Sequence, residues 1–125
     1  MLINISNHPI TYWDDEQKNA AKQYGKCVDL PFPSVDPHGG EDYIDKLAEE
    51  YVKQVIKYQS EYNESVVVHL MGEMTFVYSL LEKLRQERIK CIASTTERIS
   101  RYADDGVKET HFSFARFRNY FNTTL

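Results

Sequence analysis

Short apolar runs alternate with helix-like segments along residues 1–94, and this alternation constrains the fold more than any other feature of the chain. The runs typical of β-strands cover residues 2–5, 27–30, 65–70 and 89–94. The segments between them with helix-start signals or helical apolar spacing cover residues 14–24, 41–59 and 75–87. Strands that are joined through helices pair in parallel, with helices on both faces of the sheet. We therefore predict an α/β fold, a single Rossmann-like domain with a mainly parallel sheet.

The pattern changes after residue 97, where two strand-like runs replace the alternation. Residues 98–103 and 108–115 flank Asp104-Asp105-Gly106, and Asp-Gly between two such runs is a hairpin signal. Residues 111–115 alternate apolar and polar side chains, as expected of a half-buried antiparallel strand. We predict a C-terminal antiparallel hairpin added to the parallel sheet.

Length and composition place the chain in an ordinary class. It has 125 residues, of which 42% are hydrophobic, and we predict one domain over residues 1–125. No run approaches the about 20 apolar residues of a membrane span, and the N-terminal residues lack the features of a signal peptide. Cys27 and Cys91 lie in predicted strands with neither disulfide nor metal-ligand spacing, so we expect reduced core cysteines. These features predict a cytoplasmic protein with no membrane partner.

Charge is unevenly distributed along the chain. The net charge is −4, but residues 82–125 carry 9 Lys+Arg against 6 Asp+Glu and contain all six arginines. A protein that coats DNA is normally basic overall, so we expect no DNA partner. A local arginine cluster suits a small anionic ligand, because the guanidinium fork matches phosphate oxygens. A solvated helix face together with a charged strand edge is the alternative interpretation.

Polar or small residues follow three of the predicted strands. In open α/β sheets, ligands bind outside the carboxyl ends of the strands, so these segments are expected to converge on one site. Gly72 permits close approach of a ligand, a helix start at Thr75 would direct N–H groups at an anion, and Arg98 can pair with phosphate. The alternatives are a strand-to-helix turn at Gly72, an N-cap at Thr75 and an ordinary edge strand over Ser94-Thr95-Thr96. The candidate ligand-binding residues are Ser6, Asn7, His8, Met71, Gly72, Met74, Thr75, Ser94, Thr95 and Thr96.

Two side chains near the central strand could transfer protons. His69 and Glu73 are an acid–base candidate pair, although a hydrogen-bonded core histidine is an equally good interpretation of His69. No Cys/His/Asp cluster has metal-ligand spacing, so we expect neither a metal site nor a cofactor. The P-loop, the GxGxxG dinucleotide motif and the GxSxG nucleophile elbow are all absent from the sequence.

Four segments give the chain a family resemblance. They are Ser6-Asn7-His8-Pro9, His69 through Phe76, Ala93 through Arg98, and the ending Phe112…Phe114…Phe117-Arg118…Tyr120. With these segments the chain resembles the stand-alone minimal CARF (CRISPR-associated Rossmann fold) proteins, specifically the small Csx group of ring nucleases. The resemblance covers the whole chain at the level of architecture. It implies a homodimer that binds a cyclic oligoadenylate second messenger, most often the tetramer, and cleaves it to switch off type III CRISPR antiviral signalling.

The resemblance also implies a chemistry that needs no metal. A ribose 2′-hydroxyl attacks the neighbouring phosphate and leaves a 2′,3′-cyclic phosphate, so the protein must align the reacting atoms and stabilise the developing charge. On this interpretation Arg98 and the backbone from Gly72 to Thr75 hold phosphate, and His69 or Glu73 transfers a proton. Larger CARF proteins often carry a lysine near the central loop, where this chain has Glu73.

Two other functions fit the same residues. A module that only binds a cyclic nucleotide, as a sensor or a sponge, needs the same pocket but gives no product. A non-catalytic protein-interaction module would instead use the arginine- and aromatic-rich C-terminal hairpin as its surface.

Overall fold

The computed structural model describes residues 1–122 and contains one five-stranded mixed sheet. The strands are β1 (Leu2–Ile5), β2 (Cys27–Asp29), β3 (Val67–Leu70), β4 (Lys90–Tyr102) and β5 (Lys108–Asn119). Their order is β2-β1-β3-β4-β5, in which the first four strands are mutually parallel and β5 is antiparallel to β4. This confirms the predicted α/β fold, its mainly parallel sheet and its C-terminal hairpin.

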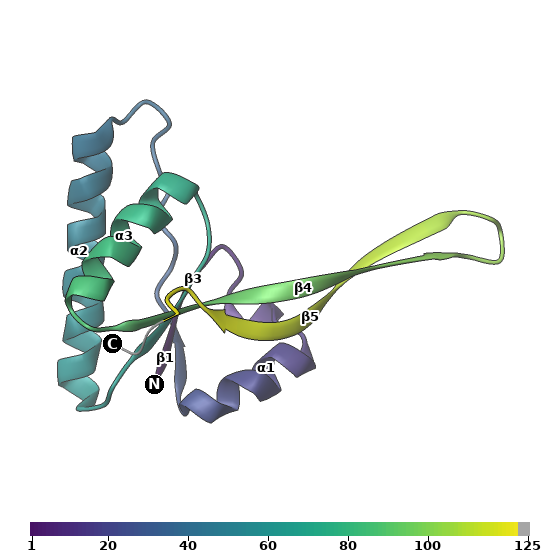
Figure 1. Cartoon of the computed structure of the whole chain (residues 1–125), viewed down its shortest axis with the longest axis horizontal. Helices are drawn as coiled ribbons and strands as arrows, with labels where there is room; N and C mark the ends of the chain where they lie inside the picture. Colours follow the sequence, from purple (N-terminus) through teal and green to yellow (C-terminus); the bar gives the residue numbers. More distant parts are fainter. Residues whose placement is uncertain (123–125) are drawn as a thin grey trace.

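Helices cover both faces of the sheet, as predicted (Figure 1). The long helix α2 (Glu41–Tyr62) and α3 (Met74–Gln86) pack on one face, and α1 (Asp15–Ala21) packs on the other. Short 3₁₀ turns at Ile10–Tyr12 and Lys22–Tyr24 flank α1. No helix of the described residues is both long enough and apolar enough to cross a membrane.

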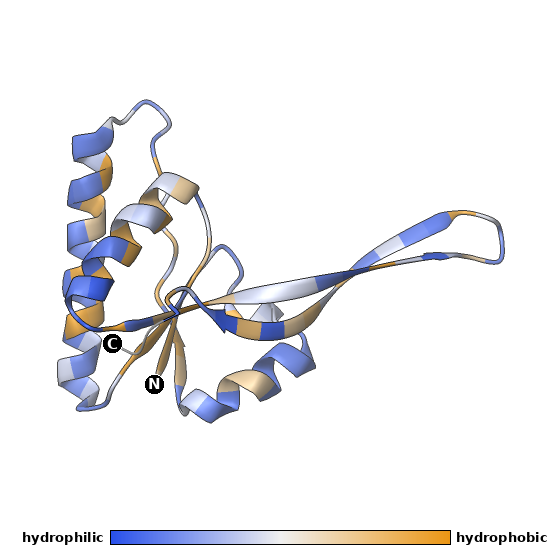
Figure 2. Cartoon of the chain, in the orientation of Figure 1, coloured by the Kyte–Doolittle hydropathy of each residue, from blue (hydrophilic) through white to orange (hydrophobic). Residues whose placement is uncertain are grey.

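The main core lies between the sheet and the helices α2 and α3. Buried side chains recur four residues apart on α3, at Phe76, Leu80 and Leu84, so they form one apolar stripe (Figure 2). They pack on Ile3 and Val68 from the central strands. Of the two cysteines, Cys91 lies in this core as expected, whereas Cys27 is only partly buried, and both are free thiols.

One strand is longer than predicted. The sequence predicts a strand over residues 89–94 and a separate strand-like run over 98–103, with residues 94–98 as a candidate binding segment at a strand end, but β4 continues without a break from Lys90 to Tyr102. The chain stays extended because β5 pairs with it along its whole outer length, from Ile92↔Asn119 to Tyr102↔Lys108. Ser94, Thr95, Thr96 and Arg98 are therefore ladder residues, not residues of a loop at a strand end.

A β-bulge at the base of this hairpin determines which side chains face the second, smaller hydrophobic cluster, on the α1 side of the sheet. The register shifts between Thr95, which pairs with Arg116, and Thr96, which pairs with Phe114. Side chains three apart on a regular strand point to opposite faces, but a bulge allows both to face the same side. Phe114 and Phe117 accordingly both pack in the cluster with Trp13 under α1.

Beyond the bulge the hairpin projects from the body of the protein as a two-stranded ribbon, residues 97–112, which we call the arm (Figure 1). Every residue of the arm is exposed except Ala103, which is half-buried. Gly106 makes the turn at a φ of 81°, the left-handed region that glycine adopts without strain.

We expect the arm to open far more readily than the central strands. A two-stranded ribbon without a packed face has little stability of its own in water. Backbone amides of residues 98–111 should therefore exchange with deuterium orders of magnitude faster than those of β1 and β3, measured by hydrogen-exchange mass spectrometry. Equal protection of arm and core amides would contradict this prediction and indicate that another surface covers the arm.

Candidate functional site

The order of the strands creates a natural place for a ligand. From β1 the chain moves outward to β2, and from β3 it moves outward in the other direction to β4 and β5. Open α/β sheets bind ligands at the carboxyl ends of strands where the order reverses in this way. Here that point lies between the ends of β1 and β3, at Ile5↔Leu70.

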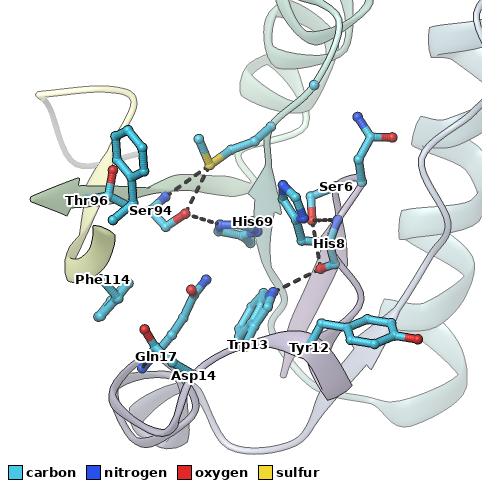
Figure 3. Close-up of a pocket in the computed structure, with 14 residues that line it drawn as sticks. Ser6, His8, Tyr12, Trp13, Asp14, Gln17, His69, Ser94, Thr96 and Phe114 are labelled. Carbon is cyan, nitrogen blue, oxygen red and sulfur yellow. Dashed lines mark hydrogen bonds between the residues drawn. The ribbon is translucent and has the colours of Figure 1, made fainter. Parts of the chain in front are cut away.

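A cavity of about 620 Å³ occupies this point (Figure 3). Its walls come from the turn after β1, the start of α1, the end of β3 and the base of the β4–β5 hairpin. Its volume lies within the range of small-molecule sites. The lining residues are Ser6, Asn7, His8, Tyr12, Trp13, Asp14, Gln17, His69, Met71, Gly72, Ser94, Thr96, Phe112 and Phe114.

Eight of the thirteen residues proposed from the sequence line this cavity. They are Ser6, Asn7, His8, His69, Met71, Gly72, Ser94 and Thr96. Although β4 does not end at Ser94, the Ser94 side chain still lines the site, because β4 pairs directly with β3. The predicted convergence of three segments therefore holds, with one segment contributing from within a strand.

The other five proposed residues lie elsewhere. Met74 and Thr75 line shallower hollows on the α3 side, and Thr95 donates its hydroxyl to the carbonyl of Arg116 at 3.1 Å. Arg98 pairs with Phe112 in the hairpin ladder, outside the cavity lining. Glu73 is at the start of α3 and is likewise not among the lining residues.

Glu73 explains why the start of α3 is not an anion site. Its carboxylate accepts hydrogen bonds from the backbone N–H groups of Thr75 and Phe76, at 3.0 and 2.8 Å, and from the Thr75 hydroxyl. These hydrogen bonds lower the pKa of Glu73, the Thr75 hydroxyl contributing most. The backbone donors that were expected to hold phosphate at Thr75 are therefore occupied by the chain's own carboxylate, which a phosphate would have to displace.

The arginines are also dispersed. Arg85 and Arg88 lie at and beyond the end of α3, Arg98 and Arg101 on the arm, and Arg116 and Arg118 on β5. None of them, and no lysine, is among the fourteen described residues that line the cavity. The expected arginine cluster around the ligand is not present on a single described chain.

His69 is the centre of the site's polar network. It is 2% exposed, and its Nδ1 lies 2.8 Å from Asn4 Oδ1 while its Nε2 lies 3.2 Å from Ser94 Oγ. The rings of Trp13 and Phe117 pack edge-on against it at 5.1 and 5.7 Å. Burial, with a smaller effect of His8, lowers the pKa of His69 to about 4, so its imidazole is neutral at physiological pH.

This pKa predicts an acid-sensitive fold. Because the pKa of His69 is about 4 in the folded protein against an ordinary 6.5, the unfolded chain binds more protons between those values. The free energy of unfolding should fall by about 3 kcal/mol as pH drops through this window. Urea unfolding across pH 4–7 would measure it, and H69N should lack this contribution. An equal pH dependence in H69N would contradict the assignment.

Sequence reasoning missed three members of this network. Asn4 lies in the apolar run predicted as the first strand, Asp29 ends a short strand, and Trp13 precedes a helix. Asn4 Nδ2 donates to Asp29 Oδ1 and to the His8 carbonyl, and Trp13 Nε1 donates to the same carbonyl, all at 2.9 Å. A polar residue within an apolar strand was the available signal, since a buried amide needs partners.

Gly72 has a packing role in addition to its place in the cavity wall. A Cβ at this position would overlap the ring of Phe32, which packs edge-on against Phe76 at 5.3 Å. We expect Gly72→Ala to destabilise the protein by about 1–3 kcal/mol, because the Phe32 ring must move. Gly40→Ala is the matched control, since nothing lies within 4 Å of a Cβ there. Equal thermal stability of the two variants would contradict this packing role.

Among the described residues there is no group of three or more His, Cys, Asp or Glu side chains placed to hold a metal ion. The cavity lining offers hydroxyl, amide, imidazole and aromatic groups for a ligand.

A family model described as the uncharacterized protein MJ1673 family matches residues 1–118. No curated protein and no solved structure matches the chain.

Proposed function

We propose that this chain, which belongs to the uncharacterized protein MJ1673 family, is a ring nuclease that binds and cleaves a cyclic oligoadenylate, cyclic tetra-adenylate in the first place. The observation that carries the proposal is a neutral histidine, His69, beside a nucleotide-sized cavity at the point where the strand order reverses. The same strand order supports the further proposal that the fold is Rossmann-like.

The cavity suits the base and ribose of a nucleotide. Tyr12 and Phe112 are 82% and 69% exposed at its rim, and exposed aromatic rings are stacking platforms for bases. The hydroxyls of Ser6, Ser94 and Thr96 and the amide of Asn7 are short hydrogen-bonding groups suited to ribose. Recognition on this account begins with stacking and ribose contacts, because the lining has no lysine or arginine.

The proposed reaction begins with a proton transfer, and His69 in the cavity wall is a group that can accept the proton. The 2′-oxygen of one adenylate bonds to its neighbouring phosphorus, the bond from that phosphorus to the 5′-oxygen breaks, and a 2′,3′-cyclic phosphate remains. An unprotonated imidazole nitrogen such as that of His69 can take up the 2′-hydroxyl proton. Positioned hydroxyls and a dry aromatic wall hold the reacting atoms in line.

A whole ring of four nucleotides exceeds a cavity of about 620 Å³, so part of it would extend past the rim. Arg98 lies on the strand face of Thr96, two residues farther along the arm, where it could meet an overhanging phosphate. We propose that a second copy of the chain covers the rest of the ring, in a cytoplasmic homodimer that ends type III CRISPR signalling. Light scattering of the purified protein with and without the ring tests the dimer.

A binding-only sensor or sponge is the second candidate, and one observation favours it. Cleavage gathers negative charge on the phosphate, and the lining of one chain holds no cation to stabilise that charge. Binding by stacking alone would not need such a cation.

Turnover separates the two candidates. The protein is incubated with cyclic tri-, tetra- and hexa-adenylate in EDTA, and the products are separated by chromatography. Conversion of one ring to linear products ending in 2′,3′-cyclic phosphate supports the nuclease. Retention of one ring without conversion supports the sensor, and neither retention nor conversion would refute both.

A further inference from the structure

We infer that Ser94 is the residue that contacts the reacting hydroxyl, and that Asn4, anchored by Asp29, is a positioning residue that directs the unprotonated nitrogen of His69 toward Ser94. The inference rests on the proposed function for its chemistry, but the hydrogen-bond chain itself is independent of any ligand. Nothing in the match to the MJ1673 family assigns a role to these four residues.

The orientation of the Asn4 amide is fixed by its partners. The His8 carbonyl and an Asp29 carboxylate oxygen both lie 2.9 Å from the same end of the Asn4 amide, and both groups can only accept hydrogen bonds. That end must be the NH₂ group. The oxygen of Asn4 therefore points to His69 Nδ1 at 2.8 Å and to the Ser6 hydroxyl at 2.8 Å.

This orientation fixes the tautomer of His69. Because Asn4 Oδ1 can only accept, Nδ1 of His69 must carry the hydrogen that lies between them. In the neutral ring Nε2 is then the nitrogen with the free lone pair, and it faces Ser94 Oγ at 3.2 Å. The edge-on contacts with Trp13 and Phe117 hold the ring in this plane.

Burial favours Ser94 over His69 as the first contact of a ligand. Both residues line the cavity, but His69 is 2% exposed whereas Ser94 is half-buried, so an incoming hydroxyl meets Ser94 first (Figure 3). The Ser94 hydroxyl also lies 3.1 Å from Met71 Sδ, a second acceptor for its single hydrogen. A ligand that donates to Ser94 Oγ would favour the hydrogen bond from Ser94 to Nε2.

The proton path balances without a further reagent. As the 2′-oxygen bonds to phosphorus, its proton passes to Ser94 Oγ while the Ser94 proton passes to His69 Nε2. The leaving 5′-oxygen takes a proton from water, and His69 returns its proton to solvent through Ser94. Asn4 stabilises the imidazolium by accepting from Nδ1, which is the part played by the orienting residue in other histidine relays.

Among the described residues, three further ionisable side chains lie around the relay. His8 and Asp14 line the same cavity, and Asp29 accepts a hydrogen bond from Asn4. The Asn4 amide lies between the Asp29 carboxylate and the imidazole of His69. Exchanging the two residues, as N4D/D29N, therefore places the carboxylate next to the imidazole without changing the number of charges. This exchange makes the relay testable in the unliganded protein.

The first test is the ¹⁵N NMR spectrum of histidine-labelled protein without ligand. We expect His69 as the Nδ1–H tautomer, with an Nε2 resonance that shifts in S94A and stays in place in the control S100A, on the exposed arm of the same strand. An Nε2–H tautomer, or no shift in S94A, would overturn the relay whatever the protein binds.

The second test is the double variant N4D/D29N, compared with wild type by NMR titration of His69. A carboxylate beside Nδ1–H stabilises the imidazolium, so we expect the pKa of His69 to rise. No rise would mean that the side chain at position 4 does not face Nδ1 of His69, and that result would overturn the positioning role.

The third test uses cleavage. S94A should lose about 10²-fold or more in rate while still binding the ring, and S94T should recover part of the loss because it restores a hydroxyl. Full activity of S94A would overturn the role of Ser94. If wild type cleaves no ring, the proposed function fails, whereas the NMR results still decide whether the relay exists.

Discussion

Replacing His69 with asparagine is expected to slow cleavage of the cyclic oligoadenylate by about 10²- to 10⁴-fold, the range for loss of a general base. Asparagine places a side-chain amide near the position of Nδ1, so it can still donate to Asn4 Oδ1, but it has no group at the position of Nε2. The variant therefore removes the base and keeps the buried anchor. Binding of the ring should change little, since base stacking and ribose contacts remain.

Single-turnover kinetics and equilibrium binding measure the two effects separately. The matched control is His111→Asn, because His111 is an exposed histidine of the arm that lies outside the cavity lining. The control should cleave and bind as wild type does. Cleavage by H69N at the wild-type rate would contradict the role of His69, and loss of binding in H69N would make the histidine a ligand-binding group instead.

Phe76→Ala is expected to cause the largest loss of stability, about 3–5 kcal/mol, since it removes a fully buried aromatic ring. Phe76 packs edge-on against Phe32 and Tyr51, both at 5.3 Å, and so joins α3 to the loop after β2 and to α2. Native proteins typically have only about 5–15 kcal/mol of stability, so a loss of this size would be a large fraction of the total.

Urea unfolding compares this variant with Tyr78→Ala, on the same helix but 67% exposed. The control should lie within about 0.5 kcal/mol of wild type. A loss below about 1 kcal/mol in Phe76→Ala would contradict the assignment of Phe76 to the centre of the core. Because Gly72 rests on Phe32, the Phe76 variant is also expected to loosen the cavity wall.

The parallel pairing of β1 to β4 could be predicted from the sequence, because each of these strands contains a local apolar run and helical segments separate the runs. The continuation of β4 could not, since Thr95, Thr96 and Glu97 are polar residues typical of a strand end. What keeps them extended is pairing with β5, whose partners lie 16–21 residues away in the chain, as in Thr95↔Arg116 and Glu97↔Ser113. Tertiary pairing decided the structure there, against the local pattern.

The residues of the candidate site divide in the same way, into those that local patterns predict and those that depend on partners far away in the sequence. Ser6, His69 and Ser94 could be found because polar residues at or near strand ends meet at one edge of the sheet. Asn4 was missed because a single amide within an apolar strand has no pattern of its own, and its partners His69 and Asp29 lie 65 and 25 residues away. The capping role of Glu73 was missed because the N–H groups at the start of α3 were expected to bind a ligand. The Glu73 carboxylate accepts hydrogen bonds from those same N–H groups.

The most direct test of the central claim is the position at which the ligand binds. Cyclic tetra-adenylate is titrated into ¹⁵N-labelled protein, and the backbone amide shifts are mapped. The account predicts the largest changes at Ser6, His8, His69, Gly72 and Ser94, around the ends of β1 and β3. Changes confined to the arm or to the α2–α3 face, or no changes at all, would contradict it.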